Sequence, residues 1–275
     1  MYSRATPFDK SDKLVGTHQK IDRAARLILR EIMANEAEDN PLAGFPKIHQ
    51  ILRFEGKNGP DGIKMKSPGK DEPWHFVDPH GDMTKMQTYV ENHIYNLAQA
   101  LKRQDQVRAS FEAAWLAHAV TDALTPAHQY PMEDKIVELS GKLPSERDKL
   151  RKKMFLPGET WLKSARINWE YIGPKGVMST HMLYELGVAI LISPVAPRRL
   201  AKKPRKDDLE QVLSGHFMKL FEEKINYVAD RRYYQRFTLK GWTNRLALET
   251  ANELLPQISQ VVALAWLAGI EESKK

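Results

Sequence analysis

A short stretch near the middle of the chain combines three side chains that can bind a metal ion. His118 and Asp122 stand four residues apart, so a helix would place them one turn apart on the same face. Apolar neighbours such as Val120 predict that this face is buried, where an imidazole and a carboxylate are costly without partners. Pro126 is expected to end the helix and to bring His128 round after it. These donors favour zinc, although the segment alone is equally compatible with a buried His–Asp hydrogen bond.

A second pair, His181 and Glu185, repeats the four-residue spacing beside the apolar run 188–195. One such pair is weak evidence for a metal site, but two pairs that both enter apolar helices are considerably stronger. The chain has no cysteine, which excludes disulfides and thiolate zinc sites. Any zinc must therefore be held by histidine, aspartate and glutamate.

Glycine and proline are concentrated in residues 56–73, which predicts an irregular loop. Asp61 lies inside this loop, and His75 follows it between two aromatic residues. Loops held on a helical scaffold commonly carry site residues, so both side chains are candidates. Asp78 and Asp82 come next, and capping of the following helix is the expected role for both.

The spacing of apolar residues predicts helices along most of the chain. Helices are expected over 10–36, 83–103, 106–125, 161–171, 207–233, 244–255 and 256–270, with another apolar helix beginning near residue 179. Taken alone, His18 near the start of the first helix is typical of a surface or satisfied core histidine. We see no alternating strand pattern and no internal repeat. The sequence therefore predicts one all-α, bundle-like domain over 1–275, with ligand pairs lining a cleft between helices.

The net charge of +7 favours an anionic partner such as phospholipid headgroups or nucleic acid. Part of the excess lies in an expected loop insertion at 196–206, whose cations are Arg198, Arg199, Lys202, Lys203, Arg205 and Lys206. Such a run is more often a solvated loop than a binding site, but peripheral contact with an anionic membrane surface is the function it could have. No stretch approaches the roughly 20 apolar residues of a transmembrane helix. Residues 1–10 lack the apolar segment of a secretory signal, which predicts a cytoplasmic protein unless a leader has been left out.

Taken together, these segments resemble the zinc-dependent phospholipase C family, which shares its fold with the trizinc single-strand nucleases. The resemblance covers about residues 16 to 190 and includes the fourteen-residue spacing from Asp61 to His75. The motifs that carry it are Gly16-Thr17-His18-Gln19-Lys20-Ile21, Trp74-His75-Phe76-Val77-Asp78-Pro79, His118-x-x-x-Asp122 followed by His128, and His181-x-x-x-Glu185.

The resemblance implies two or three zinc ions. In the family pattern, one zinc would be held by Asp61, His75, His118 and Asp122, a second by His128, His181 and Glu185, and a third by His18 and Asp122. The family's third zinc is normally chelated by an N-terminal tryptophan exposed on leader cleavage, whereas this chain has no tryptophan before Trp74. Family members are usually secreted.

The implied activity is zinc-dependent cleavage of phosphodiester bonds, with phospholipids as the favoured substrates. A pair of zinc ions about 3.5–4 Å apart would clamp the phosphate and activate water. Asp61 is the candidate to orient or deprotonate that water, and Asp78 could accept the second ring proton of a ligand histidine. Two alternatives remain open: a single-strand nuclease on the same metal core, and a zinc-stabilised or lipid-docking scaffold without turnover. The oligomeric state is not predicted.

Overall fold

The protein is all-α, as the apolar spacing predicts. The computed structural model describes residues 16–34, 41–66, 76–143, 146 and 155–275, and every regular element within these ranges is a helix or a helical turn. The predicted positions of His75 and Trp74 lie outside the described residues.

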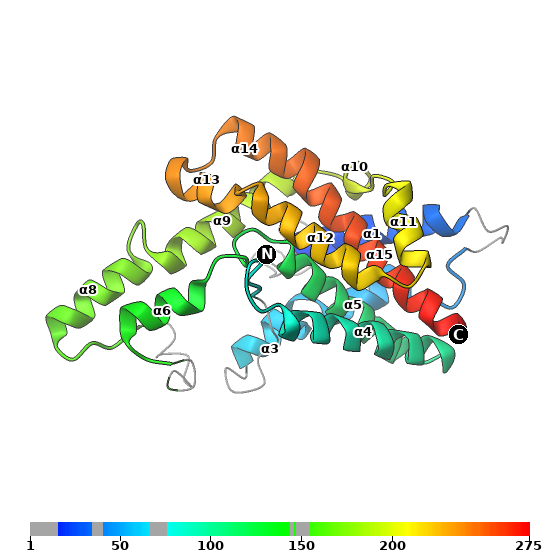
Figure 1. Ribbon diagram of the computed structural model, residues 1–275, viewed down its shortest axis with the longest axis horizontal. Helices are drawn as coiled ribbons and strands as arrows, with labels where there is room; N and C mark the ends of the chain where they lie inside the picture. Colours follow the sequence, from blue (N-terminus) through cyan, green and yellow to red (C-terminus); the bar gives the residue numbers. More distant parts are fainter. Residues whose placement is uncertain (1–15, 35–40, 67–75, 144–145, 147–154) are drawn as a thin grey trace.

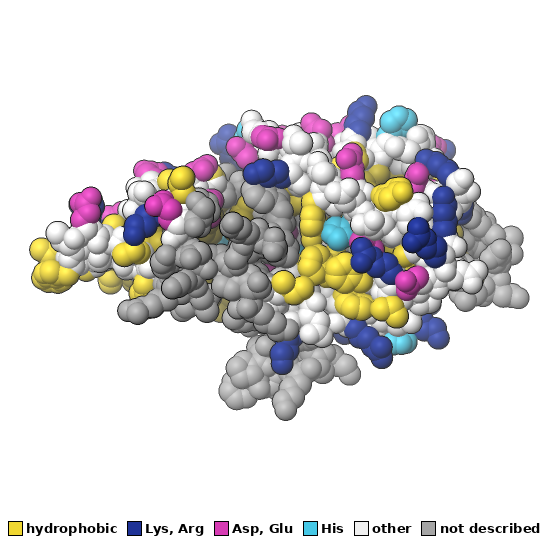
Figure 2. Space-filling view, turned by 90° about the horizontal axis from the view of Figure 1, so that it is seen from below, with side chains coloured by type: hydrophobic (Ala, Val, Ile, Leu, Met, Phe, Trp, Pro, Cys, Tyr) yellow, Lys and Arg dark blue, Asp and Glu magenta, His cyan; other side chains and the backbone are white. Residues whose placement is uncertain are grey.

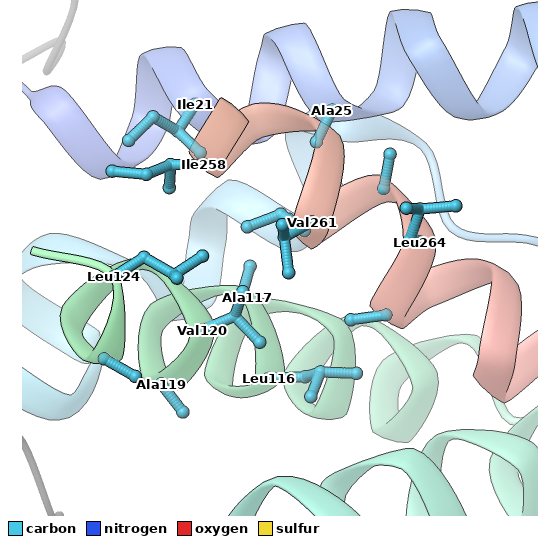
Figure 3. Close-up of a cluster of buried hydrophobic side chains, with 14 of the residues drawn as sticks. Ile21, Ala25, Leu116, Ala117, Ala119, Val120, Leu124, Ile258, Val261 and Leu264 are labelled. Carbon is cyan, nitrogen blue, oxygen red and sulfur yellow. The ribbon is translucent and has the colours of Figure 1, made fainter. Parts of the chain in front are cut away.

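Four long helices pack together at the centre of the molecule (Figure 1). They are α1 (Thr17–Met33), α4 (Thr84–Lys102), α5 (Gln106–Ala123) and α15 (Leu255–Lys274). Figure 3 shows Ile21 of α1, Val120 of α5 and Val261 of α15 within one apolar cluster. The indole N–H of Trp266 also donates to the carbonyl of Ala113 at 2.8 Å. This buried core fixes the helices that carry the candidate site.

The remaining helices surround the central four and extend the molecule to one side. They are α2 (Ile48–Ile51), α3 (Pro60–Lys66), α6 (Met132–Ser140), α8 (Trp161–Ile172), α9 (Val177–Ile192), α10 (Pro197–Leu200), α11 (Lys206–Leu213), α12 (Phe217–Asp230), α13 (Tyr233–Lys240) and α14 (Asn244–Glu249). Helices α6 and α8 form an arm on the left of Figure 1, which α9 joins to the bundle. The arm has a small apolar cluster of its own, formed by Met132, Ile136, Leu156, Ile167 and Tyr171.

Two of the sequence predictions differ from the structure in instructive ways. The segment predicted as an irregular loop contains the helical turn Gly56–Asn58 and helix α3, because Pro60 suits the first turn of a helix. The single helix predicted over 207–233 is broken after Leu213, where Gly215 takes a φ of +81°, a conformation that glycine adopts without steric cost. The last residue of that range, Tyr233, begins α13.

Other helices follow the expected pattern more closely. The helix predicted over 106–125 ends at Ala123, three residues before Pro126. Pro256 lies in the first turn of α15, as predicted. The two closing helices are continuous with each other through a π-helical turn, Thr250–Leu254. Residues 10–15 of the first predicted helix lie outside the described part of the chain.

The closing helical run, Asn244–Lys274, is long and apolar enough to cross a membrane. However, 72% of its most apolar window is buried inside the protein, and core helices commonly have this composition. Burial therefore accounts for its apolar character, and the expected absence of a transmembrane segment stays a prediction.

The basic segment 196–206 joins α9 to α11, and it contains the short helix α10. Its six cationic side chains are exposed. Several of them have local partners: Lys202 donates to the carbonyl of Asn252 at 2.6 Å, and Arg205 contacts Asp207 at 3.1 Å. The segment is thus a charged connection whose membrane contact stays a prediction.

Candidate metal centre

Helix α5 presents His118 and Asp122 on its buried face, as their spacing predicts. The helix begins at Gln106, where the side chain of Asp105 accepts the N–H of Arg108 at 2.9 Å, a helix-capping bond. After its end at Ala123, the N–H of His128 donates to the carbonyl of Thr125 at 2.8 Å. This tight turn brings His128 back beside Asp122.

Asp122 lies at the centre of the site, because three histidines contact its carboxylate. Its Oδ2 lies 3.3 Å from Nε2 of His118, and its Oδ1 lies 3.4 Å from both Nε2 of His18 and Nδ1 of His128. These rings come from α5, α1 and the turn after α5. All four side chains are buried, so one carboxylate gathers three potential ligands away from solvent.

The first group of potential ligands comprises His18, Asp61 and His118. One ligand atom from each lies within 4.8 Å of the others, and Nε2 of His118 is 3.8 Å from Oδ1 of Asp61. The two imidazole rings are stacked with centroids 4.0 Å apart. Asp61, on α3, is the most exposed member, with 31% of its side chain accessible. It therefore forms the open side of this group.

The second group comprises His128, His181 and Glu185. Oε1 of Glu185 lies 2.8 Å from Nε2 of His128 and 3.2 Å from Nε2 of His181. The ring of Phe76 lies against both histidines, with centroid distances of 5.1 and 6.0 Å. Nδ1 of His181 is buried and has no hydrogen-bond partner among the described residues. A buried ring nitrogen in this state is costly unless a ligand meets it.

Hydrogen bonds from one side chain and from the backbone hold these elements together. The buried Nζ of Lys20 on α1 donates to the carbonyls of Ile192 and Val195, at 2.7 and 3.3 Å, where α9 ends. The N–H of Val77 donates to the carbonyl of His128 at 3.1 Å. The helices that carry His18 and His181 are thereby tied to each other, and the His128 turn is tied to the segment after His75.

The electrostatics of the first group favour positive charge beside Asp122. Burial opposes charging of the His118 ring, but the carboxylates of Asp122 and Glu55 overcome it and hold its pKa well above the usual value. Burial also opposes ionisation of Asp122, but His128 and His118 hold the pKa of Asp122 well below its usual value. A divalent cation placed here would supply the charge that the carboxylate requires.

The second group resembles the first at its carboxylate but differs from it at His181. Burial disfavours ionisation of Glu185, but contacts with His181 and His128 hold its pKa well below the usual value. By contrast, burial lowers the pKa of the His181 ring below its usual value, and His128 adds to this effect. A neutral imidazole beside an ionised carboxylate is the state in which both can bind a metal ion.

Glu55 is a member of the site that the sequence did not reveal. Its Oε2 lies 3.3 Å from Nδ1 of His118, so it can accept the ring proton and leave Nε2 to face Asp61 and Asp122. Outer carboxylates commonly fix ligand histidines in this way. Burial and the neighbouring Glu55 also raise the pKa of Asp22 well above its usual value. No motif marks Glu55, since it meets His118 only through the packing of the turn before α3 against α5.

Asp78 was expected to accept the second ring N–H of a ligand histidine, but at His118 Glu55 takes this role. Asp78 is exposed, and its Oδ1 accepts the N–H of His80 at 3.0 Å. Among the described residues, no histidine ring donates to it. Asp82 lies just before α4, where its Oδ1 accepts the N–H of Thr84 at 2.8 Å, as a capping residue would.

The structure brings together seven of the eight residues predicted as metal ligands. His75 lies outside the described residues. His18 lies with Asp61 and His118, whereas the family pattern assigns it to a separate third ion with Asp122. The other four of the nine histidines, which are not among the predicted ligands, lie elsewhere: His49, His80 and His216 are exposed, and His93 is paired with Glu112.

The donor types suit zinc, and several donor separations match a zinc site, whereas His118–Asp61 at 3.8 Å is longer and His128–Glu185 at 2.8 Å is shorter. Bonds of about 2.0–2.1 Å to a tetrahedral ion place neighbouring ligand atoms roughly 3.3–3.4 Å apart. The contacts of Asp122 with His118 and His18, at 3.3 and 3.4 Å, have this length, and the His181–Glu185 contact is 3.2 Å. Imidazole and carboxylate are also the ligand types that zinc accepts in the absence of thiolates.

Comparison of the chain with protein-family models, with curated proteins and with solved structures found no match.

Proposed function

We propose that the protein is a zinc-dependent phosphodiester hydrolase whose favoured substrates are phospholipids. The observation that carries the proposal is the position of Asp122 between three buried histidines, flanked by two groups of potential ligands. Two adjacent groups of potential ligands with a carboxylate between them would suit the hydrolysis of phosphate diesters.

The residues would divide the work between the two groups. His18, Asp61 and His118 would hold one ion, and His128, His181 and Glu185 a second. The carboxylate of Asp122, which contacts His18 and His118, would join the first set. When bound, a pair of zinc ions neutralises charge on the phosphoryl oxygens and makes a nearby water more acidic. Asp61 is the side chain best placed to accept a proton from that water, because it is the most exposed member of its group. Glu55 would keep Nε2 of His118 directed at the ion.

Phospholipid is favoured over nucleic acid by the surroundings of the second group. The ring of Phe76 covers His128 and His181, and α9, which carries His181 and Glu185, also exposes the apolar side chains of Met182, Leu186 and Ile190. The exposed cations of 196–206 follow the end of α9 rather than the turn that carries its ligands. Nucleic-acid sites instead place cations along the path of the phosphate backbone.

The direct test combines zinc analysis with hydrolysis of a chromogenic phosphodiester by the full chain. Two or more zinc ions per chain are expected after dialysis, together with hydrolysis that a chelator abolishes and added zinc restores. His118→Ala should remove both properties. His216→Ala replaces an exposed histidine outside the site and serves as the matched control.

Three results would decide against parts of the proposal. If the protein retains no zinc, the histidines are ordinary buried core residues. If the protein binds zinc but does not hydrolyse the phosphodiester, it is a metal-stabilised scaffold. Faster cleavage of single-stranded nucleic acid than of phosphatidylcholine vesicles would assign the same metal core to a nuclease.

A further inference from the structure

Helix α8 in the arm has apolar side chains on two opposite faces. On one face Ile167 and Tyr171 are buried in the small cluster of the arm. On the other face Trp161, Leu162, Trp169 and Ile172 are exposed, the two tryptophans by 76% and 68%. At 100° per residue, these four lie within about 100° of arc, so they form one stripe. We call it the α8 stripe.

A buried face explains one apolar side of a helix, but not a second side that meets solvent. At roughly 200 Å² for each large aromatic ring, the α8 stripe exposes on the order of 500 Å² of apolar surface. That is near the upper limit for the largest apolar patch of an ordinary monomer, and such patches commonly mark binding surfaces. Figure 2 shows apolar side chains at the free end of the arm.

Charge on the helix leaves the α8 stripe close to neutral. Lys163 is paired with Glu159 at 2.8 Å, and Arg166 with Glu170 at 2.9 Å. These pairs lie beside the stripe and add no net charge to it, while the whole chain carries a net charge of +7. Binding of a partner must therefore come mainly from burial of the apolar side chains of the stripe. The net charge of the chain adds only a long-range attraction.

We infer that the α8 stripe inserts into the interfacial region of a phospholipid surface. Tryptophan favours this region because its ring is apolar and its N–H remains hydrated. An amphipathic helix that lies in the membrane plane uses such a stripe with charged residues beside it. A second copy of the chain fits less well, since each copy carries a net charge of +7 and two copies repel each other. The stripe also lies on a projecting arm (Figure 1) rather than in a groove.

The location of the arm links this surface to the candidate metal centre. The cluster beneath α8 includes Phe76 at its edge, and the ring of Phe76 contacts His128 and His181. Docking through α8 would therefore hold the second ligand group close to lipid. The docking itself does not rest on hydrolysis, so each can fail without the other.

The test is sedimentation of the full chain with phosphatidylcholine vesicles in the presence of a chelator, at physiological and at high salt. The parent protein is expected to bind at both salt concentrations, with a blue shift of tryptophan emission. The double variant Trp161→Gln, Trp169→Gln should bind at least about tenfold more weakly, because each indole contributes through burial. The matched control is Leu239→Gln, Leu248→Gln, which removes two apolar side chains of α13 and α14 that are 81% and 62% exposed.

Circular dichroism checks that both double variants keep the helical content of the parent. The inference is overturned if the parent does not bind the vesicles, if the tryptophan variant binds as tightly as the parent, or if the leucine variant loses as much binding. It is equally overturned if the parent sediments as a dimer that the tryptophan variant dissociates, since a second copy would then cover the stripe.

Discussion

Helix α5 carries two buried carboxylates ten residues apart, Glu112 and Asp122, and their surroundings differ. Glu112 pairs with His93 on one side and with Arg108 on the other, and the edge of the Tyr89 ring covers His93. One acid thus meets one histidine and one permanent cation. Asp122 instead meets three histidines, with Glu55 behind His118 and Asp61 in front.

The comparison separates a structural ion pair from a potential ligand site. Burial is the same for both acids, so burial alone does not distinguish them. What differs is the number of imidazoles for each carboxylate and the presence of an open side at Asp61. The carboxylate of Glu112 is taken up by His93 and Arg108, which leaves little to bind a metal ion. Around Asp122, by contrast, several nitrogen and oxygen atoms lie close enough together to bind the same ion.

The largest effect is expected from Asp122→Asn, which keeps the shape of the side chain and removes its charge. Phosphodiester hydrolysis should fall by about three to four powers of ten, or roughly 4–5.5 kcal/mol, because both ligand groups contact this carboxylate. Zinc content measured by atomic emission should fall with it. Full zinc occupancy in the variant would mean that Asp122 is only a buried hydrogen-bond acceptor.

Glu112→Gln makes the equivalent change at the closed cluster. Zinc content and hydrolysis should stay at the parent values. The free energy of unfolding should fall by roughly 2–3 kcal/mol, because hydrogen bonds to a charged acceptor are replaced by weaker ones. Urea denaturation measures this loss. A fall in zinc content would contradict the separation of the two clusters.

Glu55→Gln tests the residue that supports His118 from behind. Zinc affinity should fall about 10–100-fold, because the ring of His118 loses its charged acceptor. Competition with a chromophoric chelator measures the change. Gln87→Ala removes a partly exposed side chain with one weak hydrogen bond and should leave the zinc affinity unchanged. An equal loss of affinity in both variants would show that Glu55 is not part of the site.

The smallest effect is expected at Glu249, an acid held by cations without any histidine. Hydrogen bonds from Arg236 and Arg245 lower its pKa from 4.5 to about 2. A lowered folded-state pKa stabilises the protein above pH 4.5, and this contribution is lost as the pH falls towards 2. The parent should therefore lose more stability than Glu249→Gln over that interval, with zinc binding at neutral pH unchanged in both. Equal acid sensitivity would show that the two arginines do not hold this carboxylate.

Much of the site was accessible from local spacing. A separation of four residues predicted that His118 would face the same way as Asp122, and likewise His181 and Glu185, because helical geometry alone decides it. The turn at Pro126 was equally local. These predictions required no knowledge of how the helices pack.

The remaining features depend on contacts between distant segments. Glu55 meets His118 across 63 positions, and no periodicity encodes that approach. Helix α3 was not predicted, because the glycines and prolines around it indicated an irregular loop. Proline is also common in the first turn of a helix, where Pro60 lies. From the sequence, the exposed stripe of α8 could not be distinguished from one that faces the core, because both consist of apolar residues. Only the packed structure shows which face of the helix is covered.

The hydrogen bond from Lys20 to the carbonyl of Ile192, at the end of α9, joins residues that are 172 positions apart. Ribosomes add about 5–20 residues per second, so the first helix waits roughly 9–35 s for the carbonyls that receive its lysine. Until then α1 lacks this tie to the helix that carries His181 and Glu185. Assembly of the centre is therefore a late event of translation, and a nascent chain that stalls just before Ile192 carries all eight predicted ligands without the hydrogen bonds that join α1 to the end of α9.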